Sequence, residues 1–473
     1  MTQKKLFRYS VIILLTLCLS SSSLWACFCV VVGKNASADG SVLIGHNEQN
    51  SGPRYLNFRR IPRIQHQPGA MVTFRGGAQI PQVAETYSYL WSQNPGATFG
   101  DAYFNEFGVA VVSNACPDRT QRGQADVESG GATYLLRRIV AERAKNAREG
   151  VQIAGKIVEQ IGYGSARSYT IADKNEAWML ALTNGKQWVA QRIKDDEVAL
   201  LPNIYIIDVV DLNDKEYFMA SADLVSYATQ KGWYNPAEGK PFSFCQAYSA
   251  PRRTLVDPRQ WRAQSLVTGH EVPETPDRQL PFTVKPSKKM TIKDVATVLR
   301  YHGGKGAICS PRTQEVGIFQ LRADMPTEIG CVYWRTNAEP CTSILVPWYC
   351  GITETPPTYY DNVPVETQLT LEYQFGGAPA LSELDKKHAW HPFQKIQDWV
   401  AQNHDERCPQ VRQNFDQFED KLFAAQEQFD ARTVDLYNRD KEQAIQMITR
   451  YSATQANAAV TQAHALIAQL KIE

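Results

Sequence analysis

The chain has 473 residues, 43% of them hydrophobic, and its 50 Lys and Arg nearly balance its 49 Asp and Glu. A chain of this length can bury a large core and build two or three domains of the usual size of about 150 residues. The near-neutral charge excludes the strongly basic surface with which proteins bind nucleic acid or an anionic membrane. Neither is expected as a partner.

Residues 1–26 have the three parts of a secretory signal peptide. Basic residues open the segment, an apolar run covers 11–19, and the small residue Ala26 precedes the expected cleavage point. The run is shorter than the roughly 20 residues of a transmembrane helix, and no later stretch approaches that length. We predict an exported protein, periplasmic or extracellular, without a membrane span, whose mature chain begins at Cys27.

An N-terminal Cys27 would carry a nucleophile and a base on one residue. Its free α-amine, with an ordinary pKa of about 8, can accept the thiol proton, and the thiolate can then attack an amide carbonyl. Two other interpretations stay open. The Leu24–Cys27 segment is close to a bacterial lipobox, which would make Cys27 a lipid anchor, although Trp25 fits that motif poorly. In an oxidising compartment Cys27 could also form a disulfide.

The other cysteines form no recognisable metal motif. Removal of the leader takes Cys18 from the ten cysteines and leaves an odd number, as expected when one of them is a working thiol. The remaining eight allow too many pairings for any disulfide to be assigned. Cys27 and Cys29 are too close in sequence for a zinc knuckle, and the chain has no His-Glu-x-x-His. No metal site and no cofactor are predicted.

A β-hairpin is predicted at the start of the mature chain. Residues 28–32 and 41–45 are rich in β-branched and aromatic types, and turn-forming residues fill positions 33–40 between them. Two antiparallel strands of similar length place residue 46 or 47 close to Cys27.

Helices are predicted from the spacing of apolar residues. Residues 135–140 and 154–161 each have one apolar face, typical of helices packed on a sheet. A capping-box pattern at Thr291 predicts a helix that begins there and stops at Gly303. A longer helical pattern covers 411–451.

The segment 26–41, ACFCVVVGKNASADGS, resembles the start of the cysteine dipeptidases in the superfamily of N-terminal nucleophile (Ntn) hydrolases, a family that also includes the secernins. The similarity continues downstream in the motifs at 104–114, 171–178, 201–203 and 325–357. It covers essentially the whole mature chain. The resemblance implies an α+β fold, the Ntn-hydrolase four-layer αββα sandwich with a C-terminal helical region. The implied division is a signal peptide at 1–26, a catalytic domain at 27–379 and a helical region at 380–473.

The resemblance also implies catalytic roles. Cys27 matches the nucleophile, and Asn114 matches a residue that helps to form the oxyanion hole. An amide hydrogen bond at that place is worth roughly 3–4 kcal/mol. Asn203 matches a second polar active-site position in related amidases. From the residues alone, a turn cap is the favoured role for Asn114, and a turn residue is as plausible as an active-site role for Asn203.

One stretch departs from the family pattern. Many members end the second strand with Arg-Asn-x-Asp, where this chain has His46, Asn47, Glu48 and Gln49. In a strand, residues 46 and 48 face one side and residues 47 and 49 the other. His46 could hydrogen-bond the thiolate and Glu48 could supply a carboxylate, whereas Gln49 removes a charge that would hold the α-ammonium.

His46 and Glu48 are also predicted to contact the substrate, and three further residues are candidates for the same role. Arg252 and Arg335 could bind a substrate carboxylate, because a guanidinium binds a carboxylate through two parallel hydrogen bonds, and a surface ion pair is the alternative for each. His302 is assigned to structure or substrate contact rather than to catalysis, because an Ntn cysteine needs no histidine base.

These observations predict an exported cysteine-type Ntn hydrolase that cleaves dipeptides or short peptides through a thioester on Cys27. An amidase or acyltransferase acting on other acylated amines is the alternative within the class. A non-catalytic exported or lipid-anchored binding protein of the same fold is the alternative outside it. The expected partner is a small peptide substrate, and assembly into a homo-oligomer stays open.

Overall fold

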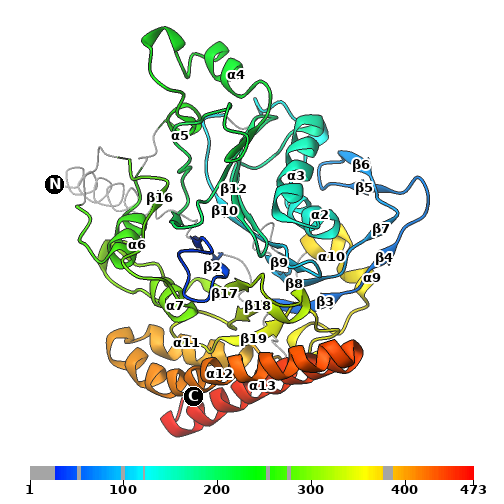
Figure 1. Cartoon of the computed structure of the whole chain (residues 1–473), viewed down its shortest axis with the longest axis vertical. Coiled ribbons are helices and arrows are strands. Elements are labelled where there is room, and N and C mark those ends of the chain that lie inside the picture. Colours follow the sequence, from blue (N-terminus) through cyan, green and yellow to red (C-terminus); the bar gives the residue numbers. More distant parts are fainter. Residues whose placement is uncertain are drawn as a thin grey trace, which may run out of the picture.

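Two antiparallel β-sheets stacked face to face form the centre of the molecule (Figure 1). The computed structural model describes residues 27–50, 55–96, 102–120, 123–251, 256–273, 279–376 and 387–472. The seven-stranded sheet has the spatial order β16 (Thr283–Val284), β14 (Val198–Leu201), β1 (Phe28–Val32), β2 (Val42–Gln49), β17 (Thr313–Leu321), β18 (Cys331–Arg335) and β19 (Val346–Tyr349).

The eight-stranded sheet lies against it. Its spatial order is β15 (Phe218–Ala220), β13 (Trp188–Arg192), β12 (Ala177–Leu182), β11 (Arg167–Ala172), β10 (Ala110–Ala115), β9 (Ala102–Asn105), β8 (Tyr89–Gln93) and β3 (Asn57–Ile61). Two short ribbons extend from the sandwich, β4 (Ile64–Gln65) with β7 (Glu85–Thr86) and β5 (Met71–Thr73) with β6 (Gln79–Pro81).

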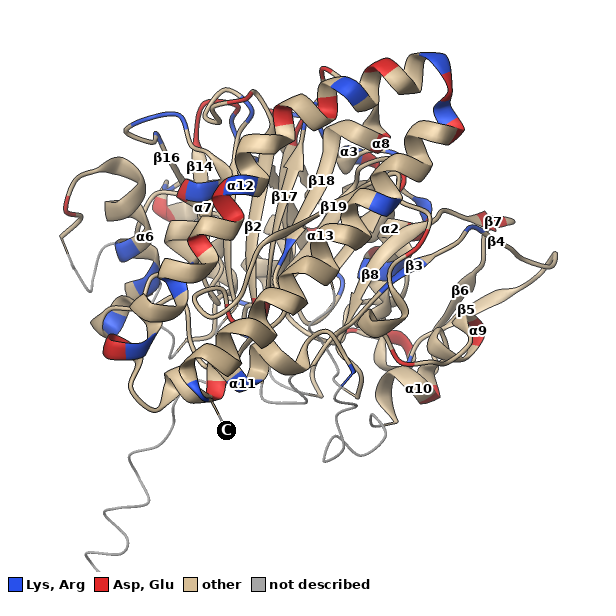
Figure 2. Cartoon of the chain, turned by 90° about the horizontal axis from the view of Figure 1, so that it is seen from below, with Lys and Arg blue, Asp and Glu red and all other residues tan. Residues whose placement is uncertain are grey.

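Helices cover both outer faces. On the eight-stranded sheet lie α2 (Leu135–Arg143) and α3 (Ala147–Ile161), whose apolar faces join the outer core of that sheet. On the seven-stranded sheet lie α6 (Pro258–Thr268), α7 (Ile292–Leu299), α11 (His391–Ala401), α12 (His404–Arg439) and α13 (Lys441–Leu470). Seen from below, α12 and α13 cross the strands of this sheet and carry charges of both signs (Figure 2).

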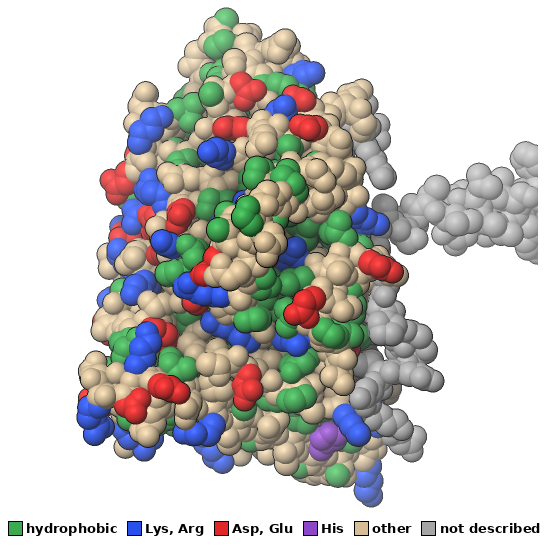
Figure 3. All heavy atoms as spheres, turned by 90° about the vertical axis from the view of Figure 1, so that its right-hand side faces the viewer, with side chains coloured by type: hydrophobic (Ala, Val, Ile, Leu, Met, Phe, Trp, Pro, Cys, Tyr) green, Lys and Arg blue, Asp and Glu red, His purple; other side chains and the backbone are tan. Residues whose placement is uncertain are grey.

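Shorter helices connect these elements. They are α4 (Leu224–Gln230), α5 (Phe244–Tyr248), α8 (Thr327–Gly330), α9 (Val365–Gln368) and α10 (Leu371–Phe375), with single 3₁₀ turns η1 (Glu128–Gly130), η2 (Pro236–Glu238), η3 (Gly304–Gly306) and η4 (Pro357–Tyr359). Within the described residues, no helix combines the length and the apolar character that crossing a bilayer requires. On the face in Figure 3, acidic and basic side chains are interspersed.

The layers confirm the predicted α+β, four-layer αββα fold. The predicted hairpin is β1 and β2, and the helices predicted around 135–140 and 154–161 are α2 and α3. The division at residue 379 stays a prediction, since residues 377–386 lie outside the described residues.

Helix α7 begins as predicted but ends earlier. Thr291 and Asp294 form the full capping box. The helix stops at Leu299 rather than at Gly303, because the amides of Ile308 and Cys309 both donate to the carbonyl of Tyr301. Those bonds turn the chain away from the helix axis.

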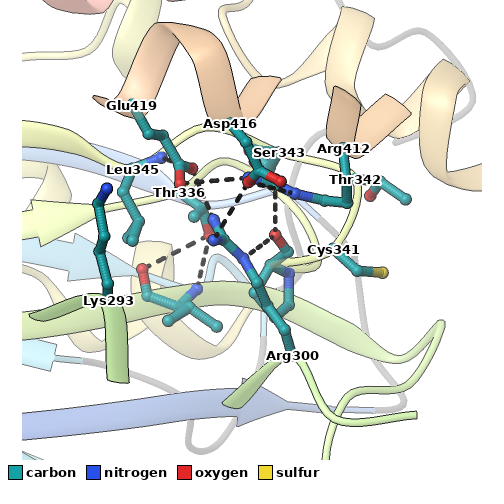
Figure 4. A network of polar contacts seen from close by, with 12 residues as sticks. Lys293, Arg300, Thr336, Cys341, Thr342, Ser343, Leu345, Arg412, Asp416 and Glu419 are labelled. Atoms are coloured by element: carbon teal, nitrogen blue, oxygen red, sulfur yellow. Dashed lines mark hydrogen bonds and ion pairs between the residues drawn. The ribbon is translucent and has the colours of Figure 1, made fainter. Parts of the chain in front are cut away.

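A buried ion network fastens α12 to the sandwich (Figure 4). Glu419, 2% exposed, accepts from Arg300 at 2.6 Å, from Arg412 at 3.2 Å and from the amide of Leu345 at 2.9 Å. Arg300 directly follows α7 and Leu345 directly precedes β19, so this one carboxylate joins three elements.

We expect Glu419→Gln to lower the free energy of unfolding by about 2 kcal/mol, because the amide removes the buried carboxylate that Arg300 and Arg412 share, although Asp416 still pairs with Arg412. Urea denaturation at neutral pH measures this. The matched control is Asp420→Asn, whose partner Lys293 is more than half exposed, and it should cost less than about 1 kcal/mol. Equal losses in the two variants would contradict the network's role.

The stability of the parent and of Glu419→Gln should also depend differently on pH. Burial acts to raise the pKa of Glu419, but the charges of Arg300 and Arg412 outweigh it, so the folded-state pKa lies below the ordinary value. The carboxylate therefore stabilises the fold above its unfolded pKa, and this contribution is lost as the pH falls. The stability gap between the parent and Glu419→Gln should narrow as the pH falls from about 5 to about 3. A stability difference that stays constant over this pH range would contradict the role of ionised Glu419 as the counter-charge of Arg300 and Arg412.

Candidate active site

Cys27 directly precedes β1, at the centre of the seven-stranded sheet, and is 5% exposed. The next same-facing residue, Cys29, lies opposite His46 of β2 and Leu201 of β14. Its Sγ lies 3.5 Å from the hydroxyl of Thr170 on the eight-stranded sheet. Because side chains alternate along a strand, Cys27 also points into the space between the two sheets.

Cys27, His46 and Glu48 lie together, and the register of the hairpin brings Glu48 rather than residue 46 or 47 directly beside Cys27. The Cys27 thiol is 3.5 Å from Glu48 Oε1 and 3.5 Å from the carbonyl oxygen of Gln49. Nδ1 of His46 is 4.0 Å from the other oxygen of Glu48. The donor atoms of these three side chains all lie within 4.8 Å of one another. A cation could be held there, but the same arrangement suits a nucleophile beside a carboxyl group.

The next residues of β2 face the other way. The amide of Asn47 donates to the carbonyls of Leu299 and Ile308, and that of Gln49 donates to Ile308 and to the hydroxyl of Thr313. Gln49 therefore points into the helix layer. The carboxyl group beside the nucleophile comes from Glu48.

Burial sets the protonation of this cluster. Burial, and next the charge of Glu48, raise the pKa of the Cys27 thiol far above its ordinary value. Burial raises the pKa of Glu48 to about 8, against the pull of Arg137 and Arg167. Burial and the charge of Arg137 lower the pKa of His46 to about 3. At neutral pH the thiol, the imidazole and most of the carboxyl group are uncharged.

The two predicted asparagines connect the sheets beside β1. Asn114, at the end of β10, donates from Nδ2 to the carbonyl of Leu201 at 3.2 Å. Asn203, just after β14, donates to the carbonyl of Ala115 at 3.1 Å. Both side chains are at most 1% exposed. Since Leu201 is the strand partner of Cys29, both amides are anchored close to the start of β1.

Arg259 of α6 is a site residue that the sequence interpretation missed. Its guanidinium donates to the carbonyl oxygen of Cys27 at 3.2 Å and to Oδ1 of Asn203 at 3.1 Å, and it pairs with Asp257 at 2.8 Å. Asp257 is the N-cap of α6 and Pro258 is its first residue, a pattern from which the start of a helix can be predicted. Nothing in that local signal indicates that the helix approaches Cys27.

Arg335 is placed differently from the other predicted residues. It lies on β18, separated from β1 by two strands, which is roughly 14 Å between backbones at the usual strand spacing. Its guanidinium is 2.5 Å from Glu315 and donates to Asn337 at 2.7 Å, and the side chain is 1% exposed. Its role in substrate binding stays a prediction. Arg252 lies outside the described residues.

The chain is similar in sequence to known proteins. A model of peptidase family C69 matches residues 26–307 and 305–376. A protein of Salmonella dublin named "Probable dipeptidase" is 30% identical over 377 residues, which is 73% of this chain and 86% of that protein. A "Probable dipeptidase B" of Streptococcus pyogenes serotype M1 is 28% identical over 71% of this chain and 74% of that protein. Among solved structures, a penicillin V acylase from Agrobacterium tumefaciens aligns over 66% of this chain and 83% of its own, with 12% identity and a TM-score of 0.35.

We expect Arg335→Gln to lower the free energy of unfolding by about 3–5 kcal/mol, because it leaves the carboxylate of Glu315 buried without its counter-charge. Chemical denaturation measures the change. Arg312→Gln, at an exposed position just before β17, should change stability by less than about 0.5 kcal/mol. An Arg335 variant as stable as the parent would show that this side chain is kept for another reason, such as substrate contact.

Proposed function

Because this chain belongs to peptidase family C69 and is a peptide hydrolase, we propose that it is an exported dipeptidase with Cys27 as its N-terminal nucleophile. The observation that carries the proposal is the position of Cys27. It follows directly on a predicted cleavage point, begins the central hairpin, and has a buried carboxyl group 3.5 Å from its sulfur. The dipeptide substrates are inferred from the names of the relatives.

Removal of residues 1–26 would supply the base. In the uncleaved chain the nitrogen of Cys27 is part of a peptide bond and cannot accept a proton, and burial disfavours the thiolate. Cleavage turns this nitrogen into an amine on the same residue as the thiol. Its ordinary pKa of about 8 lets it take the Sγ proton near neutral pH. Cleavage of the leader would thus activate the nucleophile.

Glu48 would hold the new amine. A buried carboxyl group that is largely protonated at neutral pH ionises more readily when a cation comes beside it. The α-ammonium of a processed Cys27 is such a cation, and Glu48 already contacts this residue. In this chain Glu48 would therefore take the part that the family pattern gives to an Asp at position 49.

Asn114 and Asn203 would stabilise the oxyanion. An amide nitrogen carries two hydrogens, so each side chain can keep its bond to a backbone carbonyl and donate the second hydrogen to the substrate. Arg259 bonds both Asn203 and the carbonyl of Cys27, and would hold the amide and the nucleophile in a fixed relation. Such preorganised donors stabilise the tetrahedral intermediate by several kcal/mol.

The reaction would then run in two halves. The thiolate attacks the peptide carbonyl, the Cys27 ammonium gives its proton to the leaving amine, and a thioester forms on Sγ. In the second half the amine of Cys27 takes a proton from water, which attacks the thioester, and the proton returns to sulfur as the carboxylic acid leaves.

Replacement of Cys27 tests the nucleophile. Cys27→Ser should lower kcat/KM for a panel of dipeptides by at least about a thousandfold, because a hydroxyl is a much weaker nucleophile beside the same amine. Cys29→Ser is the matched control, since it changes a buried cysteine that lies two residues further along and faces the same side. Circular dichroism and thermal melting check that both variants fold. A Cys27→Ser enzyme that works at the parent rate would exclude the proposal.

Intact-mass analysis of protein from the exporting host tests export and processing. The expected mature chain begins at an unmodified Cys27 that reacts with an alkylating reagent once the chain is unfolded. A diacylglycerol-modified Cys27, or a mature chain that begins elsewhere, would rule out the amine as base.

A further inference from the structure

Three cysteines and two histidines from distant parts of the sequence meet on the outer side of the seven-stranded sheet. His302 follows α7, Cys309 precedes β17, and Cys341 lies between β18 and β19, while His404 and Cys408 belong to the first turns of α12. The three cysteines are buried and the histidines half-buried. We call these five residues the Cys/His cluster. Their spacing in the sequence forms no metal-binding motif.

The distances within the cluster match those between ligands of one metal ion. Nε2 of His302 lies 3.2 Å from Sγ of Cys341, and Sγ of Cys309 lies 3.6 Å from that same sulfur. Two thiolates bound tetrahedrally to zinc at 2.3 Å are about 3.8 Å apart. The donor atoms of His302, Cys309, Cys341 and the neighbouring Glu339 all lie within 4.8 Å of one another.

Helix α12 supplies the rest of the cluster. His404 and Cys408 are four residues apart and so lie on the same face of the helix. Their donor atoms and Sγ of Cys341 are within 4.8 Å of one another. The ring of His404 stacks on that of His302 with centroids 3.7 Å apart. Cys341 is thus shared by two groups of donors, one from the sandwich and one from α12.

The loop that carries Cys341 is held in place by other contacts. Arg300 donates to the carbonyl of Pro340 at 2.9 Å, and Arg412 donates to that of Ser343 at 2.7 Å. In Figure 4 these guanidinium groups lie beside the loop, with the sulfur of Cys341 at its side. Ala338 has φ +72°, a left-handed conformation that costs a non-glycine residue energy and is often found at functional sites.

We propose that His302, Cys309, Glu339 and Cys341, whose donor atoms all lie within 4.8 Å of one another, bind one zinc ion where α12 packs on the sandwich. Thiolate and imidazole ligands in a tetrahedral set favour zinc over magnesium or calcium, which prefer oxygen. On binding, the two thiols lose their protons to solvent as two sulfur–zinc bonds form. On α12, His404 packs against the ligand His302 and Cys408 lies near the ligand Cys341.

The zinc would be structural rather than catalytic. The carbonyl of Ile308, the residue before Cys309, accepts bonds from Asn47 and Gln49, which face away from Cys27. The strand β2 therefore separates the cluster from the nucleophile. Four protein ligands leave no open position for substrate or water. This inference does not depend on the proposed peptidase mechanism.

Metal analysis of the full chain, purified from its exporting host without added chelator, tests the proposal. We expect about one zinc ion per chain, as in closed structural sites, and no bound zinc in Cys341→Ser. Cys245→Ser, which removes a buried cysteine of α5 outside the cluster, is the control and should keep its zinc. His302→Ala should lose the metal and His404→Ala should retain it. The reverse result would overturn the ligand assignment.

Cobalt substitution tests the same site without a variant that could fail to fold. Co²⁺ in place of zinc should give the thiolate-to-metal charge-transfer and visible bands of a tetrahedral sulfur site. Protein that binds neither Zn²⁺ nor Co²⁺ under reducing conditions would overturn the proposal. A disulfide between Cys309 and Cys341, or between Cys341 and Cys408, in the metal-free protein from the host would also overturn it.

Discussion

The antiparallel register between β1 and β2 is the constraint on which the candidate active site depends. Pairing of Cys29 with His46 brings Glu48 beside Cys27. Because side chains alternate along β2, the same register sends Asn47 and Gln49 into the helix layer. A shift of one residue would reverse these faces and place an amide, instead of a carboxyl group, beside the thiol.

Burial decides the chemistry that this geometry can support. The space between the two sheets holds Cys27, His46, Glu48 and Asn114, each at most 5% exposed. In such a place an ionised group needs a partner, and the thiol and the carboxyl group beside it both favour their neutral forms. An amine created by cleavage would change that balance. The chemistry would thereby depend on removal of the leader.

The C-terminal helices are fastened to the outer face of the same sheet by polar contacts as well as by apolar packing. Glu419 joins α12 to residues beside α7 and β19, and the Cys/His cluster gathers side chains from the same three regions. Buried ion pairs contribute little net stability, but they specify one arrangement because their loss is costly. Both features therefore favour a single position of α12 on the sandwich.

The sequence alone predicted the local structure and the nucleophile. The hairpin, α2, α3 and the capped start of α7 follow from apolar spacing, turn residues and capping, which act over a few positions along the chain. The hairpin also predicted that the end of β2 lies close to Cys27, although the register brings Glu48 beside the sulfur rather than residue 46 or 47. By contrast, Arg259 reaches Cys27 from 232 positions away, and nothing local marks it.

Only the tertiary structure decided which distant side chains meet. It placed Arg335 against Glu315, on a strand that two other strands separate from β1. It also brought Cys309 and Cys408, from a loop and a helix, close to Cys341. Sequence patterns record the period of a helix or strand and the residues at its ends. The distances between elements depend instead on how the two sheets and their helices pack, because that packing is the sum of many weak contacts with no local signature.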